Sequence, residues 1–276
     1  MVPYAASRSV HVLPAIRPHR LDVLCIPSLS GPADALNNSL IFRRQMARLA
    51  LQFGRFDLNF IYQKTSLGTG AIRLAQEFWP ATARDVYKRL LEGKKNVRVL
   101  DPCHGWGGRL IGFMAAQIHG TYYGVDPSTR TSEGCKNLYE FLKASGVPGN
   151  ADFTTAPFEA AGPYEQFDLV FTSPPYYDTE RYADEDTQAW KCPTYESFCE
   201  KFYRPMIEKS VNALKSGGVF ALNIGNKQYK LGDEARSIMS EMPVTVTVEK
   251  LSAFSRAGIT GNDSDEGEDL ILASKD

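Results

Sequence analysis

The stretch NVRVLDPCHGWGGRLIGFMAAQIHG, residues 96–120, decides the fold. It begins with a short apolar run typical of a buried strand, and after a glycine-rich turn its apolar residues are spaced as on a helix. Gly105, Gly107 and Gly108 permit a backbone with positive φ, and they let a ligand lie against bare backbone at the start of the helix. The stretch therefore predicts a strand and a helix joined by a turn that can bind a ligand.

Strands and helices continue to alternate after this stretch. The patterns predict strands at 121–127, 151–156, 167–175 and 218–226, and helices at 131–146, 194–215 and 231–241. Such alternation implies right-handed crossovers and an α/β fold with a doubly wound, mostly parallel sheet. The last two β segments, 244–251 and 268–274, flank a polar loop, so we expect them to pair antiparallel.

The first 93 residues have a different pattern. Residues 1–38 are rich in Pro, Ser and Arg and predict an irregular arm, apart from a short apolar patch, LDVLCI. Apolar residues three and four apart at 40–53 and 71–93 predict amphipathic helices, and Pro80 introduces a break in the second segment. We therefore divide the chain into a mainly helical amino-terminal extension, residues 1–93, and a main domain, residues 94–276.

Charge is distributed unevenly along the chain. The net charge is -1, but residues 1–98 hold 15 Lys and Arg against 6 Asp and Glu, a balance of +9. The other 178 residues hold 16 against 26, a balance of -10. A basic extension suits a phosphate-bearing partner, although a solvated basic helix surface would have the same composition.

The overall composition is that of an ordinary globular protein, with 43% hydrophobic and 23% charged residues. No apolar run reaches the roughly 18 to 20 residues of a membrane span, and the amino terminus lacks the apolar core of a secretory signal. We therefore expect an intracellular protein, in the cytoplasm or at the nucleoid, with no membrane partner. The five cysteines and four histidines are scattered and predict neither a disulfide framework nor a metal site.

Two carboxylates are expected at the tips of neighbouring strands. Asp101 ends the strand before the glycine turn, where a carboxylate suits a positively charged ligand group. Asp126 ends the next strand, at about the separation at which an acidic residue accepts hydrogen bonds from ribose hydroxyls in nucleoside-binding α/β folds. Either aspartate could instead be a capping residue, Asp126 for the helix after Pro127.

A proline pair ends the strongest strand, in FDLVFTSPPYYDTE, residues 167–180. The prolines remove backbone donors and fix φ, so the carbonyls of Ser173 and Pro174 can point into the crevice at the carboxyl ends of the strands. A planar NH2 group would meet only acceptors there. Tyr176 or Tyr177 adds a flat face on which a base can stack.

The glycine turn, the acidic strand tip and the proline pair, in this order, resemble the class I S-adenosylmethionine-dependent amino-methyltransferases of DNA, the N6-adenine and N4-cytosine type. The likeness covers about residues 95–275 and rests on DPCHGWGG, GVDP and TSPPYY together. The segment KTSLGTGAIRLAQEFWP, residues 64–80, is also similar to a cofactor-contacting motif of this family.

The resemblance implies S-adenosylmethionine as cofactor and a Rossmann-like methyltransferase fold. It assigns the cofactor to Asp101, Pro102, Cys103, Gly105, Gly107, Gly108, Asp126 and Ser173. It assigns the target base and catalysis to Ser173, Pro174, Pro175 and Tyr176. Aromatic residues at and after this motif, Tyr177, Tyr182 and Trp190, are candidates for the wall of the substrate pocket. No metal is required.

The implied function is methyl transfer to the exocyclic amino group of adenine or cytosine in DNA, with the base flipped out or single-stranded. Only about 65 residues separate the glycine turn from the proline pair, without the long target-recognition insert of many restriction-type enzymes. Three alternatives remain: an RNA base methyltransferase, a protein glutamine methyltransferase, and an inactive nucleic-acid-binding subunit with the same fold. The oligomeric state is not indicated.

Overall fold

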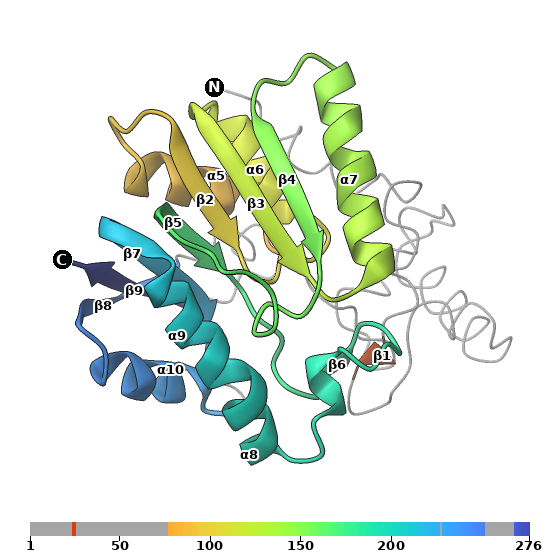
Figure 1. Cartoon of the computed structure of the whole chain (residues 1–276), viewed down its shortest axis with the longest axis vertical. Coiled ribbons are helices and arrows are strands. Elements are labelled where there is room, and N and C mark those ends of the chain that lie inside the picture. The colour runs from red at the N-terminus through yellow and green to blue at the C-terminus, as the bar shows by residue number, and fades with distance from the viewer. Residues whose placement is uncertain (1–23, 26–76, 227, 252–267) are drawn as a thin grey trace, which may run out of the picture.

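A twisted seven-stranded sheet forms the centre of the protein (Figure 1). The structure, a computed structural model, describes residues 24–25, 77–226, 228–251 and 268–276. The strand order is β4-β3-β2-β5-β7-β9-β8. The strands are β2 Val97–Asp101, β3 Gly120–Asp126, β4 Asn150–Thr155, β5 Phe167–Thr172, β7 Leu214–Ile224, β8 Val244–Lys250 and β9 Asp269–Lys275.

The direction of the strands agrees with the prediction. Strands β2, β3, β4, β5 and β7 pair in parallel, whereas β9 runs antiparallel to both β7 and β8. The predicted doubly wound, mostly parallel sheet with an antiparallel carboxyl-terminal pair is therefore confirmed.

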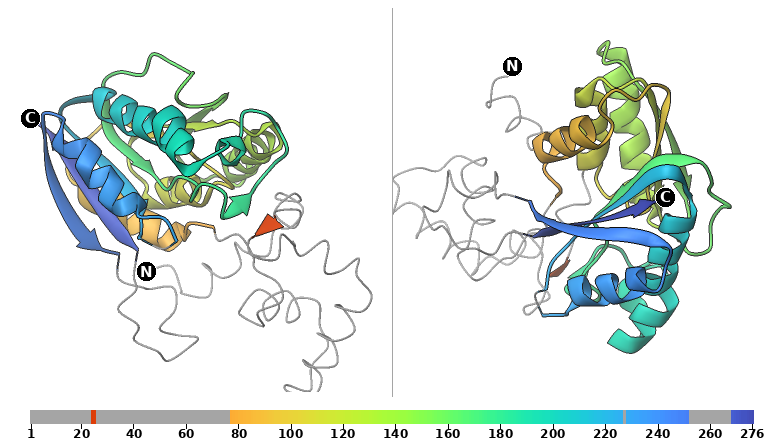
Figure 2. Two further views of the ribbon diagram at one scale, coloured as in Figure 1. Left: turned by 90° about the horizontal axis from the view of Figure 1, so that it is seen from below. Right: turned by 90° about the vertical axis from the view of Figure 1, so that its left-hand side faces the viewer.

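Helices cover both faces of this sheet (Figure 2). They are α5 Pro80–Leu90, α6 Gly108–Ala116, α7 Thr129–Ala144, α8 Tyr195–Phe198, α9 Arg204–Asn212 and α10 Leu231–Ser240. One core lies between the sheet and α5, α6 and α7, and it contains Tyr87, Phe113 and Leu138. The other lies under α8, α9 and α10 and contains Phe198, Ile207 and Ile238. Because both faces are covered, every residue of β5 is buried, which explains the uninterrupted apolar run at 169–171.

The chain changes direction between β2 and β5. From β2 it winds through β3 to the edge strand β4, and it then returns to pair β5 on the other side of β2. In open α/β sheets ligands bind at the carboxyl ends of the strands where the winding reverses. This topology brings the glycine turn after β2 beside the proline pair after β5.

Several boundaries differ from the sequence prediction. The predicted helix 194–215 is three successive segments, because a π-helical turn, Cys199–Tyr203, separates α8 from α9. Strand β7 begins at Leu214 rather than at residue 218, because Leu214 already pairs with Phe167, before a register irregularity in the β5–β7 ladder.

The predicted break at Pro80 is the start of a helix, since Pro80 occupies the first turn of α5, where its missing N–H has no helical partner to lose. Two short segments also pair outside the main sheet: β1, Leu24–Cys25, runs antiparallel to β6, Glu180–Arg181. The rest of the predicted extension before residue 77, including the helix at 40–53, lies outside the described residues.

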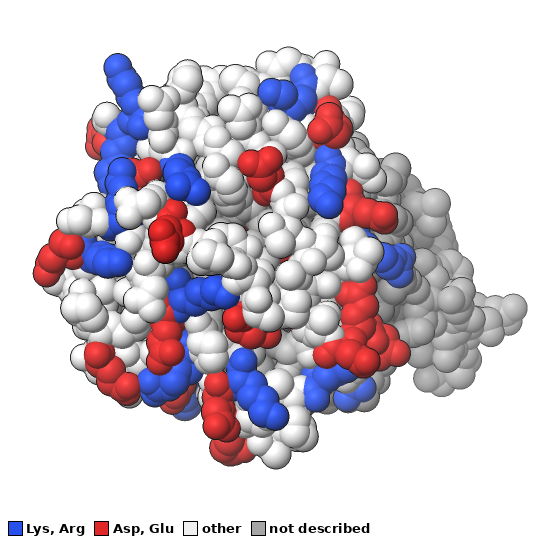
Figure 3. All heavy atoms as spheres, viewed as in Figure 1, with Lys and Arg blue, Asp and Glu red and all other residues white. Residues whose placement is uncertain are grey.

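Charges of both signs are interspersed on the face shown in Figure 3. Several basic side chains are paired with acidic ones there and elsewhere, such as Arg204 with Glu241 at 2.8 Å. Among the helices that the structure describes, none is long and apolar enough to cross a membrane.

Candidate active site

A cavity of about 970 Å³ lies at the carboxyl ends of the strands. The predicted residues that line it are Pro102, Cys103, Gly105, Gly108, Asp126, Ser173, Pro174, Pro175, Tyr176 and Tyr182. Four other predicted residues, Asp101, Gly107, Tyr177 and Trp190, are not part of its lining. The glycine turn, the tip of β3 and the proline pair therefore surround one space, although they are far apart in the sequence.

The glycine turn is shaped by close backbone contacts. Gly105 and Gly107 have φ of 53° and 84°, in the left-handed region that other residues adopt with strain. A Cβ atom on Gly108 would overlap the carbonyl oxygen of Phe78, so the chain before α5 packs directly on the start of α6. Gly107 faces α7, where an added Cβ would approach the Leu138 side chain to 2.9 Å.

Asp101 is fully buried below the cavity, which differs from its predicted contact with a cationic ligand group. Its carboxylate accepts hydrogen bonds from Arg109 Nε at 2.8 Å, Tyr122 Oη at 2.6 Å and Thr172 Oγ1 at 3.1 Å. The guanidinium of Arg109, in the first turn of α6, already neutralises the carboxylate. Asp101 therefore holds β2, α6, β3 and β5 together.

Arg109 and Glu77, unlike Asp101, are charged residues that line the cavity itself. Burial lowers the pKa of the Arg109 guanidinium, but the attraction of Asp101 more than offsets this and leaves the pKa raised, so Arg109 stays charged. Glu77 is only 7% exposed and lines the cavity beside Gly108. A cation and a carboxylate near the start of a helix can together hold a zwitterionic ligand group.

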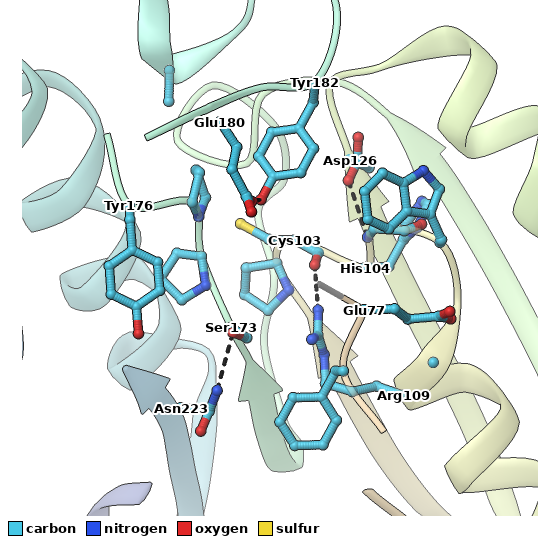
Figure 4. Close-up of a pocket in the computed structure, with 18 of the residues that line it drawn as sticks. Glu77, Cys103, His104, Arg109, Asp126, Ser173, Tyr176, Glu180, Tyr182 and Asn223 are labelled. Atoms are coloured by element: carbon cyan, nitrogen blue, oxygen red, sulfur yellow. Dashed lines mark hydrogen bonds between the residues drawn. The ribbon is translucent and has the colours of Figure 1, made fainter. Parts of the chain in front are cut away.

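Asp126 lies at the tip of β3, half-buried, with its carboxylate on the cavity (Figure 4). It accepts hydrogen bonds from the backbone N–H of Gly105 at 3.1 Å and of Ser128 at 3.0 Å. Burial raises its pKa, while His104 and the two amides act in the opposite direction. The residue thus links the glycine turn to the start of α7, and its remaining lone pairs can accept from ligand hydroxyls.

A hydrogen-bonded group joins the proline pair to the ends of β7 and β9. Asn223 Nδ2 donates to Ser173 Oγ at 3.2 Å and to Glu268 Oε2 at 2.7 Å. The Tyr176 hydroxyl donates to Glu268 Oε1 at 3.2 Å and accepts from the backbone N–H of Gly225 at 2.8 Å. Asn223 therefore holds Ser173 in place, and Glu268 and Gly225 hold Tyr176.

Aromatic residues after the proline pair have two different locations. Tyr182 lines the cavity, and its ring centroid lies 5.6 Å from that of Trp106. Tyr177 is instead buried against Phe198, and its backbone φ is 56°. Its hydroxyl donates a hydrogen bond to the carbonyl of Cys192. The indole of Trp190 donates to the carbonyl of Ala183. Tyr177 and Trp190 thus stabilise the segment after the proline pair, which differs from their predicted contact with substrate.

No group of three or more His, Cys, Asp and Glu side chains that could hold a metal ion occurs in the part of the chain that the structure describes. Cys103 lines the cavity, but burial raises the pKa of its thiol well above the usual value. Its thiol therefore stays protonated and is a poor nucleophile.

Four residues of the site were not found by sequence reasoning: Glu77, Arg109, Asn223 and Glu268. Glu77 lies within the segment 64–80 that resembles a cofactor-contacting motif, and this was the only sequence indication of it. Asn223 is a polar residue inside an apolar strand, a pattern that marks a buried polar contact but not its partner. Glu268 meets Tyr176 across 92 residues of sequence, through the pairing of β7 with β9.

Comparison with known proteins identifies the fold. No family model and no curated protein sequence matches the chain. Among solved structures, magnesium protoporphyrin IX methyltransferase from Synechocystis PCC 6803 with bound SAM is 16% identical, with a TM-score of 0.50. The match covers 88% of this chain and 94% of that one.

A SAM-dependent O-methyltransferase from Thermotoga maritima is also 16% identical, with a TM-score of 0.49 over 73% of this chain and 67% of that one. The fold is that of the class I methyltransferases. At these identities the likeness extends to the fold and not to the substrate.

Proposed function

We propose that the protein is an S-adenosylmethionine-dependent methyltransferase that modifies the exocyclic amino group of adenine or cytosine in DNA. The observation that carries the proposal is the meeting of three elements on one cavity: the glycine turn, Asp126, and the turn from Ser173 to Tyr176. The fold supports the transfer of a methyl group. The proline pair supports an amino group as its acceptor, because it presents carbonyls where backbone donors are missing.

The cavity residues fit the proposed cofactor. A volume of about 970 Å³ lies at the upper end of the usual range for small-molecule sites, which leaves space for a second ligand. Asp126 lines the cavity, where its carboxylate can accept from ribose hydroxyls. Arg109 and the first turn of α6 suit the carboxylate of the methionine part, and Glu77 suits its ammonium group.

The chain's own residues have to orient the amine and exclude water. When bound, S-adenosylmethionine supplies a methyl group: its S–CH3 bond breaks as the N–CH3 bond forms, and the nitrogen then loses a proton. The carbonyl of Pro174 accepts a hydrogen bond from the amino group and favours the pyramidal nitrogen that attacks. Tyr176 provides a flat face for the base, and such positioning accounts for most of the acceleration in this kind of chemistry.

A radiolabel experiment tests the proposal. The full-length protein is incubated with methyl-labelled S-adenosylmethionine and, separately, with duplex DNA, single-stranded DNA, RNA and a protein pool, followed by digestion to nucleosides or amino acids. We expect label in N6-methyl-2′-deoxyadenosine or N4-methyl-2′-deoxycytidine from DNA. Label only in RNA or in protein would replace the proposed substrate with one of the alternatives. Binding of the cofactor without labelling of any pool would favour an inactive subunit.

A further inference from the structure

Hydrogen bonds between residues of the cavity wall determine which hydrogen bonds the Ser173 hydroxyl can still make. Asn223, at the end of β7, is 2% exposed, and its Nδ2 lies 3.2 Å from Ser173 Oγ (Figure 4). The same nitrogen lies 2.7 Å from Glu268 Oε2. Glu268 precedes β9 and reaches the proline pair a second time through the Tyr176 hydroxyl. Both Ser173 and Tyr176 are thus tied to one carboxylate.

The orientation of the Asn223 amide follows from its neighbours. An ionised Glu268 carboxylate can only accept, as it does from the Tyr176 hydroxyl, and this orients the amide nitrogen of Asn223 toward it. The two hydrogens of Nδ2 are then directed at Glu268 and at Ser173. Asn223 Oδ1 is buried without a hydrogen-bond partner among the described residues, so the amide has no alternative pairing there that would reverse it.

A serine hydroxyl has one hydrogen to donate and two lone pairs to accept with. Asn223 occupies one lone pair of Ser173 Oγ, so one lone pair and the hydroxyl hydrogen are left. Within the residues that the structure describes, nothing accepts the hydrogen of the Ser173 hydroxyl, and Ser173 lines the cavity. The hydroxyl hydrogen is therefore available to a substrate.

We propose that Asn223 and Glu268 are positioning residues that leave the hydroxyl hydrogen of Ser173 free to be donated to the substrate. The inference rests on the proposed function. If the Pro174 carbonyl receives the amino group, the hydroxyl one residue earlier meets the atom next to that group. The substrate must then carry an acceptor there, as adenine does at N1 and cytosine at N3. The site selects an amino group beside a ring nitrogen, and Asn223 sets this specificity through Ser173.

A paired substitution reverses the polarity while keeping the shape. In the double variant Asn223→Asp with Glu268→Gln, the carboxylate introduced at position 223 accepts from the amide introduced at position 268 and from the Ser173 hydroxyl. The carbonyl of that introduced amide still accepts from Tyr176. Ser173 is then left with lone pairs only on its cavity side. Asn223→Asp alone places two carboxylates together, so we expect it to unfold at a lower temperature than the double variant, which regains the pairing.

The readout is discrimination between a base and its deaza analogue. Oligonucleotides carry either the base that the parent methylates or its 1-deazaadenine or 3-deazacytosine counterpart, which has a C–H in place of the ring nitrogen. We expect the parent to methylate the analogue about 10- to 100-fold more slowly, equivalent to about 1.4 to 2.8 kcal/mol at 1.4 kcal/mol per tenfold. The double variant should methylate both slowly and at nearly equal rates. Asn137→Asp, an exposed change on α7, is the matched control and should keep the parent's ratio.

Two failures can be told apart. A parent that methylates the base and its analogue equally well, or a double variant that keeps the parent's rate and ratio, overturns the donor role of Ser173 while the proposed function stands. A parent that labels no nucleobase overturns the proposed function, and the donor role with it.

Discussion

The hydroxyl of Tyr176 has a structural role in addition to the proposed stacking role of its ring. It donates to Glu268 and accepts from Gly225, so it fastens the proline pair to the ends of β7 and β9. Burial raises the pKa of the Tyr176 phenol, and the negative charge of Glu268 raises it further, so the hydroxyl stays protonated. From sequence, only a flat face for the base was expected.

Two variants at Tyr176 separate the ring from the hydroxyl. We expect Tyr176→Phe to lower the free energy of unfolding by about 1–3 kcal/mol, because Gly225 N–H and Glu268 lose a partner. Tyr176→Ala should in addition cut turnover on nucleic acid tenfold or more, since stacking on an aromatic ring contributes roughly 1–3 kcal/mol per base. Cofactor affinity should change little in either variant. Chemical denaturation and calorimetric titration with S-adenosylmethionine check these expectations, and an alanine variant as active as the parent would remove Tyr176 from the base site.

If Asp126 binds the cofactor ribose as proposed, cofactor binding should depend on pH. Ribose hydroxyls would donate to the ionised carboxylate, and burial raises the pKa of Asp126 above the usual value. Affinity should therefore be complete above this raised pKa and should be lost as pH falls through it. The free energy of unfolding depends on pH in the opposite direction. The contribution of Asp126 to it is present at low pH and is lost as pH rises through the folded-state pKa.

Calorimetry with S-adenosylmethionine between pH 8 and pH 5 tests this role. We expect Asp126→Ala to weaken binding by about 1–3 kcal/mol at pH 8. Asp126→Asn should flatten the pH profile. If Asp126→Ala binds as tightly as the parent, the carboxylate only accepts from Gly105 and Ser128 and serves the turn and α7.

At the scale of elements, the pair Asp101–Arg109 joins β2 to α6. Both side chains are buried, and the guanidinium donates twice to the carboxylate, at 2.8 and 3.0 Å. We expect Arg109→Met to lower the free energy of unfolding by about 3–5 kcal/mol, because it leaves a buried carboxylate without its cation. Asp101→Asn combined with Arg109→Met should lose less, since the neutral amide can still accept from Tyr122.

An exposed ion pair provides the control for that measurement. Arg204 and Glu241 lie 2.8 Å apart with side chains 37% and 57% exposed, and such pairs contribute about 0–1 kcal/mol. Urea denaturation of Arg204→Met should therefore differ little from that of the parent. Equal losses in Arg109→Met and Arg204→Met would show that the buried pair does not hold β2 and α6 together.

The order of elements could be predicted from sequence because periodicity is local. Apolar runs such as 167–172 and helical spacing such as 131–144 are visible in single segments. The π-helical turn was missed because helical periodicity does not distinguish it from an α-helix. The start of β7 was missed because its pairing with Phe167, which is distant in the sequence, determines it. The same reason applies to the site. The glycine turn and the proline pair are contiguous motifs. In contrast, Asn223 meets Ser173, and Glu268 meets Tyr176, only through strand pairing.

At the scale of the whole molecule, charge separates along the sequence. Residues 1–76 hold 9 Lys and Arg against 3 Asp and Glu, whereas residues 77–276 hold 22 against 29. Residues 77–276, which include the main domain, are thus net acidic, and both signs are interspersed on the face in Figure 3. A nucleic-acid partner would be repelled by the net charge of this domain, so attraction to phosphates has to come from the basic amino-terminal residues.

The dependence of DNA affinity on salt concentration tests whether the basic amino-terminal residues supply the attraction to phosphates. If Arg43 and Arg44 contact phosphates, the logarithm of DNA affinity should fall steeply with the logarithm of salt concentration. The double reversal Arg43→Glu with Arg44→Glu should then reduce the slope by up to about 2, since each phosphate contact contributes about 0.9. Lys136→Glu with Lys143→Glu, on the exposed side of α7, changes the net charge equally and should leave the slope close to that of the parent. Equal slopes in the two double variants would mean that net charge alone governs attraction. An unchanged slope in both would leave the basic residues as a solvated surface, and DNA would then have to be held by uncharged contacts in the cavity.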